Sequence, residues 1–133
     1  MYSKFLIGFL TVIVLSAWAT AQQTARNQRK EQLIVEELAN IAPKAVETFK
    51  RATDAMDKED YQQAIQLYRE VTVEAPTFTP ALRRLGFSLV ASGQTVDGLL
   101  LLETAVQHER SPENLVSLAE VLVASMIHRQ SRS

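Results

Sequence analysis

Few residues in this sequence have the types and spacings that carry chemistry. Its two histidines, His108 and His128, have nothing near them that completes a metal-ligand set. Four acidic residues gather in one short stretch: Asp54, Asp57, Glu59 and Asp60. The stretch lacks the spaced oxygen ligands and the turn glycine of a calcium loop. We therefore interpret this acidic cluster as a solvated corner between two helices.

Sequence motifs for catalysis are also missing. The sequence holds no G-x-S-x-G elbow, no H-E-x-x-H zinc motif and no glycine-rich phosphate loop. It contains no cysteine, which excludes a disulfide framework and a thiolate metal site. We expect no catalytic residue, no cofactor and no metal, and hence a protein that acts by binding rather than as an enzyme.

The composition indicates one helical domain of balanced charge. The chain has 133 residues, and 47% of them are hydrophobic, enough for one ordinary core. Four glycines and four prolines leave long runs without turn signals, which favours helix over sheet. The 14 Lys and Arg residues are matched by 15 Asp and Glu residues. This balance argues against a nucleic-acid partner, because proteins that bind nucleic acid carry a basic excess.

Residues 1–21 follow the pattern of a secretory signal peptide. Lys4 and the terminal amine precede an uncharged apolar run over residues 5–18, and Ala19-Thr20-Ala21 supplies an A-x-A processing site. Cleavage after Ala21 would leave Gln22 as the first residue of an exported chain, periplasmic or secreted.

A second interpretation keeps residues 1–21 as a single-pass membrane anchor. Counted over residues 5–21, the apolar run reaches the lower limit of the roughly 17–25 residues that a spanning helix needs. Arg26, Arg29 and Lys30 follow it, and positive charge tends to stay on the cytoplasmic side. Export after cleavage and anchoring through residues 5–21 therefore both stay open.

The segment after residue 21 begins with a linker and a short helix. Residues 22–30 are polar and without periodicity, and they are interpreted as a solvated linker. Residues 31–42 are predicted to be an amphipathic helix. Four apolar side chains share one face of it: Leu33, Ile34, Leu38 and Ile41.

Five further helices are predicted, over residues 43–57, 60–74, 79–92, 95–109 and 111–128. Asp60, Thr79 and Ser111 stand at the N-cap positions of three of them. No stretch alternates with period two over a convincing length, so the predicted fold class is all-α.

A large–large–small–large stripe recurs at a constant offset in every second helix. Its copies are Phe49, Ala52, Thr53 and Met56; Leu82, Leu85, Gly86 and Leu89; and Leu115, Leu118, Ala119 and Leu122. The intervening helices echo each other in the same way, with Ala64, Tyr68 and Val71 matched by Gly98, Leu102 and Ala105. The agreement favours a repeat over an irregular amphipathic bundle.

This pattern resembles the tetratricopeptide repeat, a helix–turn–helix unit of about 34 residues with the consensus W-x-x-L-G-x-x-Y, A-x-x-x-F and P. Its most specific matches are Asp60-Tyr61, Ala64-Ile65, Tyr68 and Pro76, followed by Leu85-Gly86. Residues 46–78 match one repeat, residues 79–111 a second, and residues 112–128 the first helix of a third. The resemblance implies that residues 46–128 form a short α–α superhelix, a solenoid of about two and a half repeats.

The small residues of the stripe have a packing role. Antiparallel helices approach closely only where side chains are small, so positions such as Ala64 and Gly86 are predicted at the crossings. Thr53 departs from the consensus because it replaces the small residue, and Gly98 departs because it replaces alanine. The first repeat is also one residue shorter between its two helices than the second.

The resemblance implies a concave face, lined by the first helix of each repeat, that receives a peptide or helix of another protein. The residues that would line it are Lys50, Asp54, Asp57, Arg83, Phe87, Val90, Val116, Glu120 and Val123. Lys50 and Arg83 occupy equivalent positions, as in the basic clamp with which some members hold a carboxylate. Asp54 stands where such a clamp has a neutral amide, and the alternative is two solvated surface cations.

The last predicted helix is apolar over most of its circumference. Its apolar residues are Leu115, Val116, Leu118, Val121, Leu122, Val123, Met126 and Ile127, and its narrow polar stripe consists of Glu113, Ser117, Glu120 and His128. A terminal solenoid helix normally has a polar outer face, so this surface is expected to meet something. Three interpretations of residues 112–128 stay open. They pair with a second copy as a homodimer, they receive another partner, or they fold back under residues 33–41.

We expect a small interaction module, at or beyond a membrane, that docks another protein or peptide on its concave face or its C-terminal helix. Two alternatives stay open. One is a membrane-tethered homo-oligomerisation element with no foreign ligand, and the other is an accessory subunit of a membrane or secretion assembly.

Overall fold

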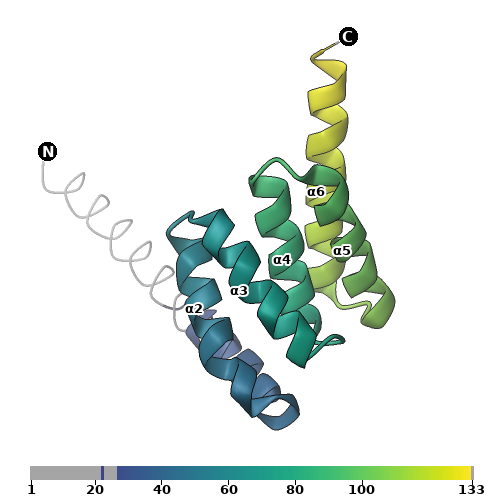
Figure 1. Ribbon diagram of the computed structural model, residues 1–133. Helices are drawn as coiled ribbons and strands as arrows, with labels where there is room; N and C mark the ends of the chain where they lie inside the picture. The colour runs from purple at the N-terminus through teal and green to yellow at the C-terminus, as the bar shows by residue number, and fades with distance from the viewer. Residues whose placement is uncertain (1–21, 23–26, 133) are drawn as a thin grey trace, which may run out of the picture. The chain divides into compact units, whose positions relative to one another are not determined.

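The computed structural model describes residue 22 and residues 27–132 (Figure 1). All regular structure in this part of the chain is helical, without a strand, which confirms the all-α prediction for the described residues. The signal peptide or anchor predicted over residues 1–21 lies outside them. No helix in the described ranges combines the length and the hydropathy needed to cross a bilayer.

The chain divides into two compact units, residues 1–37 and residues 38–133. In the first unit the described residues 27–37 are helical, so residues 27–30 belong to a helix rather than to the predicted linker. This helix continues to residue 41. Of the apolar face predicted for it, Leu38 is fully buried, whereas Leu33 and Ile41 are each 56% exposed.

The second unit is a row of antiparallel helices (Figure 1). A short 3-10 helix, η1 (Pro43–Ala45), is followed by α2 (Val46–Asp57), α3 (Tyr61–Glu74), α4 (Thr79–Ala91), α5 (Thr95–His108) and α6 (Pro112–Gln130). Each helix packs on the next along the chain, and α6 also contacts α4. With η1 and α2 taken together, the predicted helix ranges are confirmed apart from small shifts at their ends, where helix boundaries are least sharply defined.

Side-chain caps set the start of two of these helices. Asp60 accepts a hydrogen bond from the backbone N–H of Gln63 at 3.2 Å, and Ser111 accepts one from Asn114 at 3.3 Å, so both predicted caps are confirmed. The cap predicted at Thr79 is wrong. Phe78 precedes α4 without a side-chain cap, and the Thr79 hydroxyl instead donates to Oε2 of Glu109 at 2.6 Å.

The α2–α3 and α4–α5 turns have the same hydrogen bonds. The N–H of Asp60 donates to the carbonyl of Ala55 at 2.9 Å, and the N–H of Gln94 donates to that of Leu89 at 2.8 Å. The residue before each donor has a positive φ, 61° in the first turn and 93° in the second. These are the bonds of a Schellman motif, which closes a helix end with one left-handed residue.

The shared turn corrects the predicted length of the first repeat. Ala55 and Leu89 accept equivalent bonds, from Asp60 and Gln94, so the two turns are equally long and Ala55, not Met56, corresponds to Leu89. Burial agrees with this register, because Ala55 is buried and Met56 only partly so. The large side chain in α2 that misled the comparison is Phe49.

Two glycines let α4 and α5 touch backbone to backbone. A Cβ added to Gly86 would lie 2.9 Å from the carbonyl oxygen of Gly98 and 3.0 Å from Cγ of Leu102. One added to Gly98 would lie 2.6 Å from the oxygen of Gly86 and 2.5 Å from Cγ2 of Val90. This is the close crossing predicted for Gly86, and it explains why Gly98 replaces the usual alanine.

An aromatic cluster fills the core between α2, α3 and the start of α4. The rings of Phe49 and Tyr68 are 5.8 Å apart and those of Phe49 and Phe78 are 5.7 Å apart, both edge to face. The Arg84 guanidinium lies 4.9 Å from the centre of the Phe49 ring. Edge-to-face and cation–π contacts of this kind stabilise the fold beyond the contribution from burying the rings.

The hydroxyl of Thr53 links three helices. In the corrected register Ala52, not Thr53, corresponds to Gly86, so the predicted departure of Thr53 from the small residue is wrong. The Thr53 hydroxyl donates to the carbonyl of Phe49 at 3.0 Å, accepts from Nη1 of Arg84 at 2.8 Å and lies 3.0 Å from the Tyr68 hydroxyl. Since its single proton goes to Phe49, Tyr68 is the donor in the last of these bonds. Thr53 thus joins α2 to α3 and α4.

Candidate functional site

A groove of about 700 Å³ opens between α4 and α6 in the second unit. Its floor is apolar and consists of Phe87, Val90, Leu102, Val121 and Ala124. The volume falls within the roughly 300–1,000 Å³ of ordinary ligand pockets, whose walls are mainly apolar with a few polar groups. The floor is therefore suited to an apolar side chain of a bound molecule.

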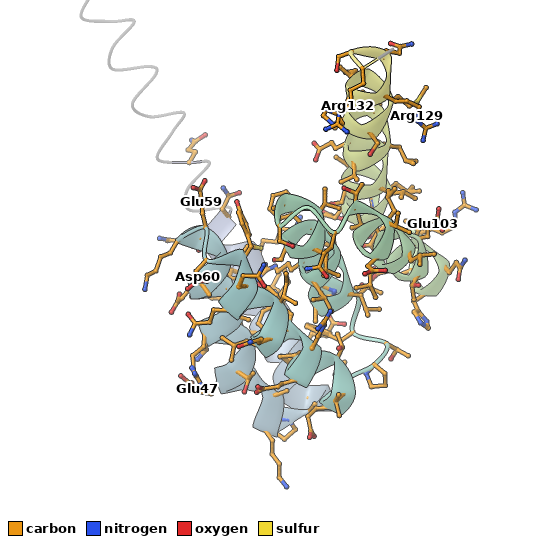
Figure 2. All side chains as sticks on the ribbon, turned by 45° about the horizontal axis from the view of Figure 1, so that its top comes forward. Glu47, Glu59, Asp60, Glu103, Arg129 and Arg132 are labelled. Carbon is orange, nitrogen blue, oxygen red and sulfur yellow. The ribbon has the colours of Figure 1, made fainter. Side chains whose placement is uncertain are left out.

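The rim of this groove is polar and carries more basic than acidic side chains. Thr95, Ser117 and Ser125 supply hydroxyls, and the ionisable side chains are Glu120, His128, Arg129 and Arg132. Arg129 lies in the last turn of α6 and Arg132 follows the helix, at the end that extends beyond α4 and α5 (Figures 1 and 2). Two guanidinium groups at one end of an apolar groove favour a ligand with a carboxylate near that end.

Three of the predicted partner-binding residues meet in the groove. Phe87 and Val90 come from α4 and Glu120 comes from α6. Phe87 remains 46% exposed, and its ring lies edge to face against Tyr61 with the ring centres 6.3 Å apart. This contact orients the exposed Phe87 ring within the apolar lining of the groove.

Val116 and Val123, also predicted to bind the partner, do not line the groove. Each is 55% exposed and lies on another face of α6. Residues 117, 120, 124 and 128 face the groove, whereas residues 116 and 123 project roughly 90° away from the middle of that stripe around the helix axis. Of the three partner-binding residues predicted on α6, the groove therefore includes Glu120 but neither Val116 nor Val123.

Arg83, predicted to form a clamp with Lys50, is bonded within the helix stack. Nη1 of Arg83 donates to Oδ1 of Asn114 at 2.8 Å, and Arg83 is partly buried. Asn114 is 1% exposed, and its Nδ2 donates to the carbonyl of Glu109 at 2.8 Å. Arg83 therefore fastens α4 to the start of α6, while Lys50, Asp54 and Asp57 lie on α2 outside the groove.

The predicted packing residues fall into three groups. Those that are buried are Phe49, Ala52, Ala64, Tyr68, Leu82, Leu85, Gly86, Leu89, Gly98 and Leu102. Met56 and Leu118 are partly buried, and Leu115, Ala119 and Leu122 are exposed. Apart from Met56, the predicted packing residues that are not buried all belong to α6, where Asn114 and Val121 are buried instead.

Several groove residues were not predicted from the sequence. Ser117, Glu120 and His128 belong to the polar stripe recognised on the last helix, so that stripe already marked this face. Arg129 and Arg132 gave no such signal, because they lie beyond the predicted end of the helix at residue 128. The role of Asn114 also had no signal, since its partner Arg83 belongs to a helix far away in the sequence.

Comparisons with known proteins add no family assignment. No family model matches the chain, and no curated protein matches it. Among the residues that the structure describes, no three His, Cys, Asp or Glu side chains are grouped so as to hold a metal ion.

Proposed function

We propose that this protein is a docking module that holds a segment of another polypeptide in the groove between α4 and α6. The observation that carries this proposal is the combination of an apolar floor, an exposed and oriented Phe87, and Arg129 and Arg132 at one end. The ligand is a peptide with an apolar side chain for the floor and a carboxylate, from Asp, Glu or a chain terminus, for the arginines.

The proposed fold family is the tetratricopeptide repeat. Support comes from the two hairpins with identical turns, from the equivalent places of Ala55 and Leu89 in them, and from Gly86 packed on Gly98. In such a solenoid the concave face belongs to the first helix of each repeat. The groove uses α4 and α6, which are the first helices of the second and third repeats in this assignment.

The module is proposed to act at or beyond a membrane. The support is the pattern of residues 1–21, with its short basic start, apolar run and A-x-A site. N-terminal sequencing of the native protein separates the two forms of this proposal. A chain that starts at Gln22 is exported and processed, whereas one that retains residues 1–21 is anchored.

Selection from a random peptide library displayed on phage tests the docking proposal. Ala124→Arg fills the groove from an exposed position, and Leu100→Arg is the matched control on α5, where Leu100 is 57% exposed and does not line the groove. Enriched peptides should carry an acidic residue near an apolar one. They should bind the wild type and Leu100→Arg alike and bind Ala124→Arg at least about tenfold more weakly, a loss of ~1.4 kcal/mol.

Two results would count against docking in this groove. One is a selection that enriches no peptide sequence over the starting library. The other is a set of peptides that bind Ala124→Arg as tightly as the wild type, because their site would then lie elsewhere on the surface.

A further inference from the structure

The face of α6 turned away from its packing contacts carries a continuous apolar surface. Six large side chains on it are between 40% and 64% exposed: Leu115, Val116, Leu122, Val123, Met126 and Ile127. Ala119, also exposed, lies at the centre of this surface. The spacing of three and four residues places all seven on one side of the helix. We call this surface the Ala119 face.

The equivalent face of α4 is covered by α5. Gly86 and Val90 meet α5 directly, at Gly98 and Leu102. The residues at the same places in α6, one repeat later, are Ala119 and Val123. The buried residues correspond in the same way, since Ala81 and Ser88 in α4 match Asn114 and Val121 in α6. The Ala119 face is thus the surface on which a helix packs in the preceding hairpin, and no described helix follows α6 to cover it.

The sequence of the Ala119 face suits a pairing with itself. Leu115 and Val116 precede Ala119 by four and three residues, and Leu122 and Val123 follow it by three and four. In two antiparallel copies related by a two-fold axis at Ala119, Leu115 of one copy meets Leu122 of the other and Val116 meets Val123. Ala119 meets its own counterpart. A two-fold interface requires a self-complementary surface of this kind, whereas a foreign helix requires no such symmetry.

We propose that the Ala119 face binds the same face of a second copy of this chain, with the two α6 helices antiparallel. Charge agrees with this arrangement, because none of the seven residues of the face is ionisable, so the pairing buries no unpaired charge. The exposed fractions of these side chains correspond to on the order of 500 Å² per copy, so complete coverage would bury about 1,000 Å², the lower limit of a specific interface.

This pairing is independent of the groove. Ser117, Glu120 and Ala124 line the groove, and none of the seven residues of the Ala119 face does. The two proposals can therefore fail separately.

Site-directed disulfide formation in the full chain tests the pairing, because the protein has no cysteine of its own. Ala119→Cys places the two thiols at the two-fold axis, and oxidation should convert most of the protein to a disulfide dimer. Leu115→Cys alone should not dimerise, since its copies would be about 12 Å apart along the helices, beyond disulfide reach. Co-expressed Leu115→Cys and Leu122→Cys chains should form the mixed dimer. Leu100→Cys, exposed on α5, measures random collision.

Three results would overturn the proposal. The first is an Ala119→Cys chain that stays monomeric with an unreacted thiol while its circular dichroism matches the wild type. The second is an Ala119→Cys chain cross-linked, by a bis-maleimide in the producing cells, to a protein of another mass. The third is a Leu115→Cys dimer as abundant as the Ala119→Cys dimer, which would indicate parallel helices.

Discussion

Glu59 and Gly93 occupy the same position in the two hairpin turns but differ in their suitability for it. Both have a positive φ, 61° for Glu59 and 93° for Gly93. A residue with a Cβ is strained in this left-handed region by roughly 1–2 kcal/mol, whereas glycine is not. No atom lies within 4 Å of a Cβ added to Gly93, so its requirement for glycine is conformational rather than steric.

Exchanging the residue types at these two turns should therefore have opposite effects. We predict that Glu59→Gly raises the free energy of unfolding by about 0.5–1 kcal/mol and that Gly93→Ala lowers it by about 1 kcal/mol. Urea denaturation followed by circular dichroism measures both. Changes of the same sign in the two variants would contradict the equivalence of the turns.

Thr53 supplies the clearest example of side-chain hydrogen bonds between helices. Thr53→Val keeps the shape but removes the hydroxyl that receives Arg84 and Tyr68. Loss of a shared partner in a partly buried network should lower the free energy of unfolding by about 1–3 kcal/mol. Thermal and urea unfolding should show this loss.

Thr53→Ser is the matched control because it retains the hydroxyl and loses only a methyl group. Thr53→Ser should lower the free energy of unfolding by less than half as much as Thr53→Val does. If the serine variant were the less stable of the two, the methyl group rather than the hydrogen bonds would explain the threonine.

The elements themselves were largely predictable, because local signals set them. Asp60 and Ser111 cap their helices by bonds to residues three positions ahead, and such bonds are visible as sequence patterns. The Thr79 cap failed because Phe78 occupies the N-cap position and Thr79 is already the first residue of α4. The predicted alignment of the first helix with α4 was wrong by one residue, because Phe49 was matched to the first large residue of the stripe.

The candidate site was less predictable than the helices that form it. Phe87, Val90 and Glu120 could be placed because helical periodicity sets the face on which each lies. The bond between Arg83 and Asn114 could not be predicted, because it depends on how α4 and α6 meet. Arg129 and Arg132 could not be included, because the extent of α6 beyond α5 is a property of the assembled unit.

At the scale of the whole molecule, α6 has three faces with three roles. Asn114 is buried in the stack, Ser117 and Glu120 face the groove, and Ala119 is the centre of the exposed apolar face. This division explains why the helix is apolar over most of its circumference without being a core helix. Its groove side is proposed for a foreign polypeptide and its Ala119 side for a second copy.

Photocrosslinking in the producing cells tests whether the groove docks another polypeptide. p-Benzoylphenylalanine at position 87 keeps an aromatic ring in the lining of the groove, and the same residue at position 100 is the control on α5. We predict that irradiation joins position 87, but not position 100, to another protein, which mass spectrometry identifies. An absence of adducts at position 87, or the same adducts from both positions, would contradict it.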